Sequence, residues 1–117
     1  PRETLLARAA QLAHRFGLPG VPLGFPETLS APDLARAALV RAFLGAKRLL
    51  LLEDPTALLG AEILPGLLAE MRAVRDDGGV VFWFTQETET VIDRTLPATQ
   101  RWRLIGSRLV AIPARAA

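Results

Sequence analysis

A run of four leucines, Leu49–Leu52, ends in two adjacent carboxylates, Glu53 and Asp54, and then in Pro55. An apolar run closed by a proline, which a helix interior excludes, predicts a short buried β-strand. Carboxylates at the carboxyl end of a buried parallel strand lie where open α/β sheets hold ligands, and paired acids there commonly face a metal ion. The run therefore favours a nucleotide site. The alternative is that Glu53 and Asp54 solubilise the strand end and cap the next helix.

Composition excludes several other classes of function. The chain has no cysteine and one histidine, His14, so disulfides, thiolate chemistry and a cysteine- or histidine-ligated zinc are excluded. Its apolar stretches are far shorter than the ~20 residues that span a bilayer, so we expect no direct membrane insertion. The formal net charge is only +2 and the arginines are spread along the chain, so we expect no nucleic-acid partner.

The N-terminal part of the chain predicts an amphipathic helix and a packed loop. Apolar residues recur at three- and four-residue steps over Glu3–Phe16, and Gly17 closes this helix. The following segment, residues 18–28, contains three prolines and two glycines and is predicted to be a loop.

A second helix is predicted from Ser30 to about Leu44. Ser30 is the expected N-cap, Pro32 lies in the first turn where a missing N–H is tolerated, and Asp33 takes the capping-box position. The apolar stripe of this helix is expected to be buried.

The rest of the chain predicts a βαβ unit and a hairpin. The unit consists of strand Leu49–Leu52, a helix over about Glu62–Arg75 and strand Val80–Phe84. The strands should be parallel, and their nearly continuous hydrophobicity predicts that both faces are covered. Arg101–Ile105 and Arg108–Ile112, joined by Gly-Ser, predict a hairpin with a type II′ turn.

The parallel arrangement brings polar residues from two strands together. Both strands finish at the same edge of the sheet, so Glu53 and Asp54 are expected beside Thr85 and Gln86.

Several segments follow one another in a characteristic order. They are Leu29–Asp33, the helix at 37–44, Leu49–Thr56, Ala57–Gly60, Thr85–Glu87, Asp93–Leu96 and Arg108–Val110. In this order and spacing they resemble the C-terminal half of an ABC-transporter ATPase domain. They are similar to its LSGGQ signature and the helix that follows, its Walker B segment, its D-loop, its switch-histidine position and its closing "DRV" and "DGRLV" pieces.

The resemblance implies an α/β fold with a partial P-loop NTPase-like sheet of βαβ form, an N-terminal helical subdomain and a C-terminal β-hairpin. Residues 1–117 would form a single domain or fragment. Residues 1–44 would be the helical signature region, and residues 45–117 would be half of the α/β core.

The resemblance also places residues at the catalytic positions. Glu53 takes the place of the magnesium-contacting aspartate, and Asp54 takes that of the glutamate that polarises the attacking water. Asp54 is one methylene shorter than glutamate, so its oxygens would stop about 1 Å short of the water, and such a misplacement can cost ~10²-fold in rate. Gln86 replaces the switch histidine and can donate a hydrogen bond but carries no positive charge.

The nucleotide-facing and dimer-facing motifs are altered as well. In the signature segment, Ser30 is followed by Ala31 and Pro32 in place of two glycines and by Asp33. Pro32 donates no N–H and Asp33 adds a negative charge, which disfavours a phosphate there. The D-loop residues are Ala57, Leu58, Leu59 and Gly60. Gly60 replaces the aspartate that reads the partner subunit.

No segment of the 117-residue sequence matches the phosphate-binding pattern G-x-x-x-x-G-K-[ST]. The sequence therefore predicts a degenerate, non-hydrolysing ABC-type protein that docks to partner subunits as a structural or regulatory half. The alternative is a fragment of an active ABC ATPase whose phosphate-binding loop lies upstream or on another chain. ATP and Mg²⁺ are expected only if the domain is completed, so enzymatic activity stays open.

The resemblance also implies partners and a location. The expected partners are a second copy or second ABC ATPase half and a membrane permease subunit. The expected location is the cytoplasm, with peripheral attachment at the inner face of the membrane as an alternative. An open apolar edge is expected on the strand Val80–Phe84, which favours self-association. An unrelated α/β interaction module, with the acids as surface caps, is the remaining interpretation.

Overall fold

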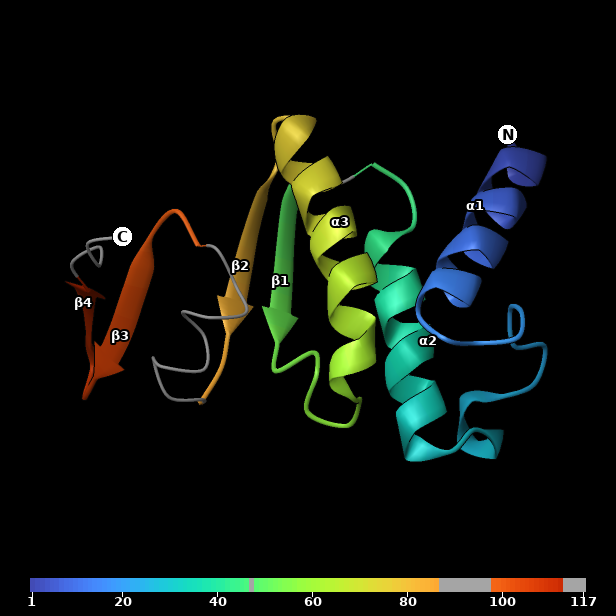
Figure 1. Ribbon diagram of the computed structural model, residues 1–117, viewed down its shortest axis with the longest axis horizontal. Helices are drawn as coiled ribbons and strands as arrows, with labels where there is room; N and C mark the ends of the chain where they lie inside the picture. The colour runs from blue at the N-terminus through green and yellow to red at the C-terminus, as the bar shows by residue number, and fades with distance from the viewer. Residues whose placement is uncertain (47, 87–97, 113–117) are drawn as a thin grey trace. The chain divides into compact units, whose positions relative to one another are not determined.

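The computed structural model describes residues 1–46, 48–86 and 98–112, and it divides into two compact units, Pro1–Gln86 and Glu87–Ala117 (Figure 1). The first unit contains α1 (Arg2–Arg15), a 3₁₀ turn η1 (Pro26–Thr28), α2 (Ala31–Phe43), β1 (Leu49–Glu53), a 3₁₀ turn η2 (Ala61–Ile63), α3 (Leu64–Asp76) and β2 (Val80–Phe84). The described part of the second unit contains β3 (Arg101–Ile105) and β4 (Arg108–Ile112).

Helix α1 ends as its sequence predicts. Gly17 adopts the left-handed conformation with φ +91°, and its N–H donates to the His14 carbonyl at 3.1 Å. The N–H of Leu18 donates to the Ala13 carbonyl at 2.8 Å. These two bonds form a Schellman motif, in which glycine is favoured because it lacks a Cβ. Buried Leu18 then packs into the core with α1.

Helix α2 confirms the predicted start and apolar stripe. Ser30 is its N-cap, and Leu39, Val40 and Phe43 are buried. Leu44, also expected to be buried in this stripe, lies at the C-cap and is only half-buried, packed against the core. Phe43 lies against Phe16, which follows α1, with the ring centroids 5.8 Å apart. The two helices therefore share one apolar core.

The βαβ unit is also confirmed. Strands β1 and β2 are parallel, in register from Leu49↔Val80 to Glu53↔Phe84. Helix α3 begins two residues later than predicted, because η2 occupies Ala61–Ile63. Gly78, with φ +87°, closes α3 and leads the chain back into β2. The α/β class is therefore observed, although a full P-loop NTPase sheet would need more strands than these two.

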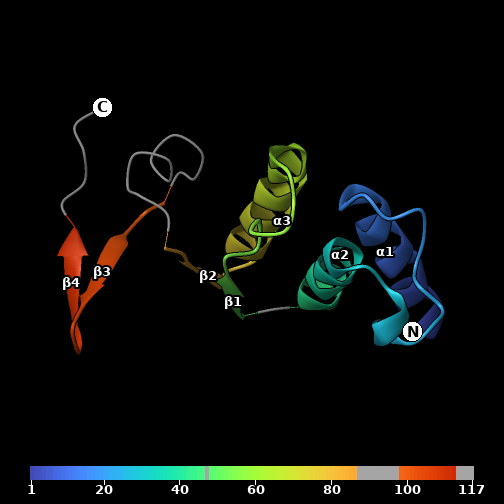
Figure 2. The same ribbon diagram turned by 90° about the horizontal axis from the view of Figure 1, so that it is seen from below.

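The prediction that both faces of the strands are covered is wrong for the described residues. Leu50 and Leu52 are buried, whereas Leu49 and Leu51 are 56% and 60% exposed. Strand β2 alternates in the same way between exposed and half-buried side chains. The reason is that α3 packs on one side of the strands and no described helix lies on the other (Figure 2). Both faces of the strands are apolar in sequence, but among the described residues only one face is covered by a helix.

The predicted hairpin is present in the second unit. Strands β3 and β4 are antiparallel, in register from Arg101↔Ile112 to Ile105↔Arg108. Gly106 has φ +60°, whereas Ser107 is not among the residues with positive φ, as a type II′ turn requires. The segments Glu87 and Asp93–Leu96, quoted above for the family resemblance, lie outside the described residues.

Among the described residues, none of the helices combines the length and the apolar character needed to cross a bilayer. The division into a helical region at 1–44 and a core half at 45–117 stays a prediction.

Candidate functional site

The carboxyl ends of β1 and β2 lie side by side, as predicted. Glu53 is the last residue of β1 and pairs with Phe84, the last residue of β2. The backbone N–H of Asp54 donates to the Phe84 carbonyl at 2.8 Å, which extends the pairing one residue beyond β1. Thr85 and Gln86 follow immediately on the neighbouring strand. The structure therefore brings the two acids and these two polar residues to one sheet edge.

Asp54 has an unusual backbone. Its φ is +37°, and among the described residues it is the only non-glycine residue with a positive φ. Aspartate tolerates this left-handed region better than most residues, because its short polar side chain can bond locally. The Asp54 carbonyl accepts the N–H of Ala57 at 3.0 Å, so the chain turns sharply after β1. Local geometry thus favours aspartate over glutamate here, a preference that the sequence pattern did not reveal.

The predicted D-loop follows this turn. Ala57, Leu58 and Gly60 are exposed, with Leu58 59% exposed, whereas Leu59 packs against the core. Three of the four residues are therefore available to a partner, and Leu59 anchors the loop.

The predicted signature residues form the first turn of α2. The Ser30 hydroxyl oxygen accepts the backbone N–H of Asp33 at 3.2 Å, which confirms Ser30 as the cap. Pro32 offers no N–H. The Asp33 carboxylate accepts from the Arg36 guanidinium, with Oδ1 and Nη1 2.8 Å apart. Ala31 is exposed and adds no polar group.

This turn is electrostatically satisfied by its own residues. A helix N-terminus attracts anions through its free N–H groups and its dipole. Here the Ser30 oxygen takes one N–H, Pro32 removes another, and the Asp33 carboxylate supplies a negative charge of its own. The Asp33–Arg36 pair was not predicted, although its three-residue spacing on a helix is a recognisable signal.

The strand-end acids Glu53 and Asp54 and the signature residues Ser30 and Asp33 belong to different elements. In Figure 1 the arrowheads of β1 and β2 and the first turn of α2 all point to the lower side of the unit. The hydrogen bonds of Ser30 and Asp33 described above are to each other and to Arg36. Those described for Asp54 are to Phe84 and Ala57.

The strand-end oxygens suit Mg²⁺ in kind. Carboxylates such as those of Glu53 and Asp54, with hydroxyl and amide oxygens, are the hard donors that Mg²⁺ prefers. However, in the part of the chain that the structure describes, no three His, Cys, Asp or Glu side chains gather as a metal site. The residues fit the metal's donor chemistry, but those at α2 do not fit a phosphate group. The magnesium role of Glu53 stays a prediction.

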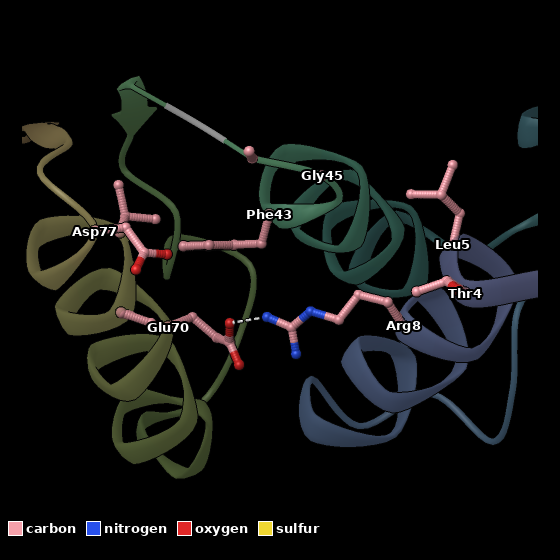
Figure 3. Close-up of a pocket in the computed structure, with 10 residues that line it drawn as sticks. Thr4, Leu5, Arg8, Phe43, Gly45, Glu70 and Asp77 are labelled. Carbon is pink, nitrogen blue, oxygen red and sulfur yellow. Dashed lines mark hydrogen bonds and ion pairs between the residues drawn. The ribbon is translucent and has the colours of Figure 1, made fainter. Parts of the chain in front are cut away.

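A buried ion-pair cluster was missed from the sequence. Glu70 on α3 is only 4% exposed and pairs with two arginines of α1. Arg8 Nη2 lies 2.5 Å from Oε2 (Figure 3). Arg15 Nη1 lies 3.0 Å from Oε1. Arg8 and Arg15 are one heptad apart and so share a face of α1 with buried Leu12, which is the signal that could have found them.

This cluster borders a cavity of about 350 Å³ between α1, the end of α2 and α3 (Figure 3). Arg8 and Glu70 lie in its wall, together with Asp77 and the apolar side chains of Leu5 and Phe43. Since Glu70 is already paired with two cations, the cavity wall holds no unpaired acid at that position. We interpret the cluster as a connection between α1 and α3.

Comparison with known proteins gives the context for these residues. No family model matches the chain. The thiamine import ATP-binding protein ThiQ of Cereibacter sphaeroides is 40% identical over 88 residues, which cover 71% of this chain and 36% of that protein. The homologues of this chain, over part of its length, are therefore ABC transporter ATP-binding proteins.

Two further relatives are named for the transport of amino acids rather than thiamine. The arginine transport ATP-binding protein ArgV of Corynebacterium glutamicum is 31% identical over 87 residues, 74% of this chain and 34% of that protein. The L-cystine transport system ATP-binding protein TcyN of Escherichia coli is 28% identical over 99 residues, 82% of this chain and 40% of that protein. The chain therefore spans about a third of the length of these curated relatives.

Proposed function

We propose that this chain is part of a degenerate ABC-type ATP-binding domain that serves as a structural or regulatory half and does not hydrolyse ATP. The observation that carries the proposal is the first turn of α2, where Asp33 and Arg36 pair with each other and Pro32 replaces an N–H donor. In the family that this chain resembles, the corresponding turn holds the γ-phosphate of a nucleotide bound by the opposite subunit. A turn that already carries its own carboxylate is a poor site for a phosphate.

The strand-end residues support the same proposal. Relative to the family pattern, Glu53 and Asp54 are in inverted order, and Gln86 stands in for histidine. The left-handed backbone at position 54 accommodates aspartate better than glutamate, so the local fold favours the shorter side chain found here. A carboxylate held about 1 Å from its working position can lose ~10²-fold in rate. Gly60 has no carboxylate, so it would not make the contact with a partner subunit that the family's aspartate makes.

The proposed partners follow from the relatives. By name, these relatives are ATP-binding proteins of import and transport systems. We therefore propose that this chain docks to a second ABC ATPase half or a second copy and to a membrane permease subunit, in the cytoplasm or at the inner face of the membrane. The exposed residues Ala57, Leu58 and Gly60 are available for such a contact.

A second candidate is an active ATPase completed by a phosphate-binding loop upstream or on another chain. The 40% identity to a thiamine import ATP-binding protein favours it, as do the paired acids at the strand end. In that case, Glu53 would hold Mg²⁺ and Asp54 would position the attacking water, with ATP bound across the completed domain. ATP is the substrate, and Mg²⁺ would neutralise its phosphates.

An exchange of the two acids distinguishes the candidates. Glu53→Asp/Asp54→Glu restores the order of the family, and Glu53→Gln/Asp54→Asn removes both charges as the matched control. The measurement is Mg²⁺-dependent phosphate release by the longest protein that the parent reading frame encodes. If the domain is degenerate, neither the unsubstituted protein nor the exchanged variant releases phosphate faster than the control.

Two results together would contradict the degenerate proposal and support the active one. The unsubstituted protein would release phosphate, and the exchanged variant would release it ~10²-fold faster. Circular dichroism of each variant checks that the turn after β1 still folds.

A further inference from the structure

Helices α1 and α3 run in opposite directions and approach each other unevenly (Figure 1). At one end they are in close contact, because a Cβ added at Gly66 of α3 would lie 2.8 Å from Arg15 Cγ and 3.5 Å from the Arg15 carbonyl oxygen. At the other end lies the cavity of about 350 Å³, with Leu5 of α1 and Val74 of α3 in its wall. The gap between the helices therefore widens from Gly66 toward the first turn of α1.

Glu70 lies on α3 between the close contact and the cavity, one helical turn after Gly66. Its Oε1 pairs with Arg15, which belongs to the close contact. Its Oε2 pairs with Arg8, which lies seven residues nearer the start of α1 and reaches across to Glu70 at the cavity wall (Figure 3). One carboxylate therefore holds α1 at two points along its length.

The two ion pairs differ in what happens when they break. The Glu70 side chain is 5% exposed and that of Arg8 is 35% exposed, and both border the cavity. If Arg8 leaves, Arg15 still compensates the charge through Oε1, and the freed Oε2 faces a cavity large enough to admit water. A hydrated, half-paired carboxylate costs less than a buried one without any partner. The Arg8 pair can therefore open while the Arg15 pair stays closed.

We propose that the Arg8–Glu70 pair is a latch that sets the angle between α1 and α3, with the close contact at Gly66 as the pivot. When the latch opens, α1 swings away from α3 at its N-terminal end and the cavity widens. Nothing in this movement requires a nucleotide, so it goes beyond the proposed function and does not rest on it.

The movement of α1 would carry α2 with it. The ring of Phe16, directly after α1, lies 5.8 Å from that of Phe43 on α2, and both residues are buried in the shared core. The chain between α2 and β1 contains Gly45, which has φ +81° and no atom within 4 Å of where a Cβ would lie. A glycine with open surroundings can absorb a change in backbone angles, as hinge residues do. The latch would therefore also set the position of the first turn of α2.

The lever arm is long enough for the movement to be measured. Glu3 precedes Arg15 by twelve residues on α1, which corresponds to about 18 Å along the helix axis. Rigid-body rotations in known switching proteins are on the order of 15°. A rotation of that size about the pivot would displace Glu3 by about 5 Å.

Distances between pairs of spin labels on the full chain test the proposal. The chain has no cysteine, so labels can be attached at introduced cysteines alone. The open-end pair is Glu3→Cys/Arg72→Cys, at exposed residues of α1 and α3. The pivot-end pair is His14→Cys/Glu62→Cys, at exposed residues near Gly66. Double electron–electron resonance gives the distance distribution of each pair.

In the Arg8→Met variant, the open-end distance is expected to lengthen by about 5 Å while the pivot-end distance stays the same. Arg8→Lys should restore most of the shorter distance, because lysine keeps a cation opposite Glu70. The matched control is Arg41→Met, which makes the same change at an exposed position of α2 and should move neither distance. If Arg8→Met does not fold, Glu70→Gln replaces it, because the neutral amide keeps the size of the side chain and weakens both pairs.

An open-end distance that is unchanged in the substituted latch, with helical circular dichroism retained, would overturn the proposal. Equal broadening of both distances would also overturn it, since that result indicates a general loss of packing and not a swing about Gly66. Either outcome leaves the proposed function untouched, because that function is tested by phosphate release.

Discussion

Replacing both Arg8 and Arg15 with alanine is expected to lower the free energy of unfolding of the unit Pro1–Gln86 by about 3 kcal/mol. The reason is that Glu70, which is 4% exposed, would keep its carboxylate in the interior without either cation. Breaking a buried ion pair from one side costs more than the pair itself contributes, because the remaining charge is uncompensated. Urea unfolding followed by circular dichroism measures the loss.

The control for this prediction is Arg41→Ala, since Arg41 is exposed on α2. We expect a change within about 0.5 kcal/mol there. The triple variant Arg8→Ala/Arg15→Ala/Glu70→Leu should recover most of the stability, because a packed apolar side chain carries no charge to solvate. A double arginine variant as stable as the Arg41→Ala control would show that Glu70 does not connect α1 and α3.

Replacing Phe16 with alanine is expected to cost about 3–5 kcal/mol of unfolding free energy. Phe16 is fully buried, and its ring lies 5.8 Å from that of Phe43, so its removal leaves a cavity between α1 and α2. Gly17 and Leu18, which close α1, follow directly and would lose their anchor. The loss should appear as a lower midpoint in urea unfolding, with secondary structure retained in the absence of denaturant if the unit survives.

Phe25 provides a matched control, because it is 75% exposed and lies in the loop before α2. Phe25→Ala should change the unfolding free energy by less than about 0.5 kcal/mol. Equal effects of the two substitutions would contradict the packing described for α1 and α2.

The order of elements could be predicted from local signals, because each element begins or ends at a residue with a specific backbone role. Gly17 and Gly78 end helices in the left-handed region, and Ser30 caps α2. Parallel pairing of β1 with β2 followed from the intervening helix α3. What could not be predicted is which layer covers each face. Apolar residues at Leu49 and Leu51 indicate a need for burial, but they do not say whether a partner layer exists.

The candidate site could be predicted only in outline. The meeting of Glu53 and Asp54 with the end of β2 required nothing beyond parallel strands. The left-handed backbone of Asp54 was not predictable, since it depends on how the turn after β1 returns to the core. Similarly, the position of Glu70 in the apolar stripe of α3 could not be explained from the sequence. Its partners Arg8 and Arg15 lie on α1 and meet it only in the folded structure.

Calorimetric titration of Mg²⁺-ATP tests most directly whether this chain holds a complete nucleotide site. The titration is made into the full chain and, in parallel, into the longest protein that the parent reading frame encodes. We predict no saturable heat for the chain, because it has no phosphate-binding loop and because the first turn of α2 is occupied by the Asp33–Arg36 pair. Saturable binding by the chain itself would contradict the proposal of a degenerate domain. Binding by the longer protein would favour the active ATPase, and binding by neither would support a docking half that does not use ATP.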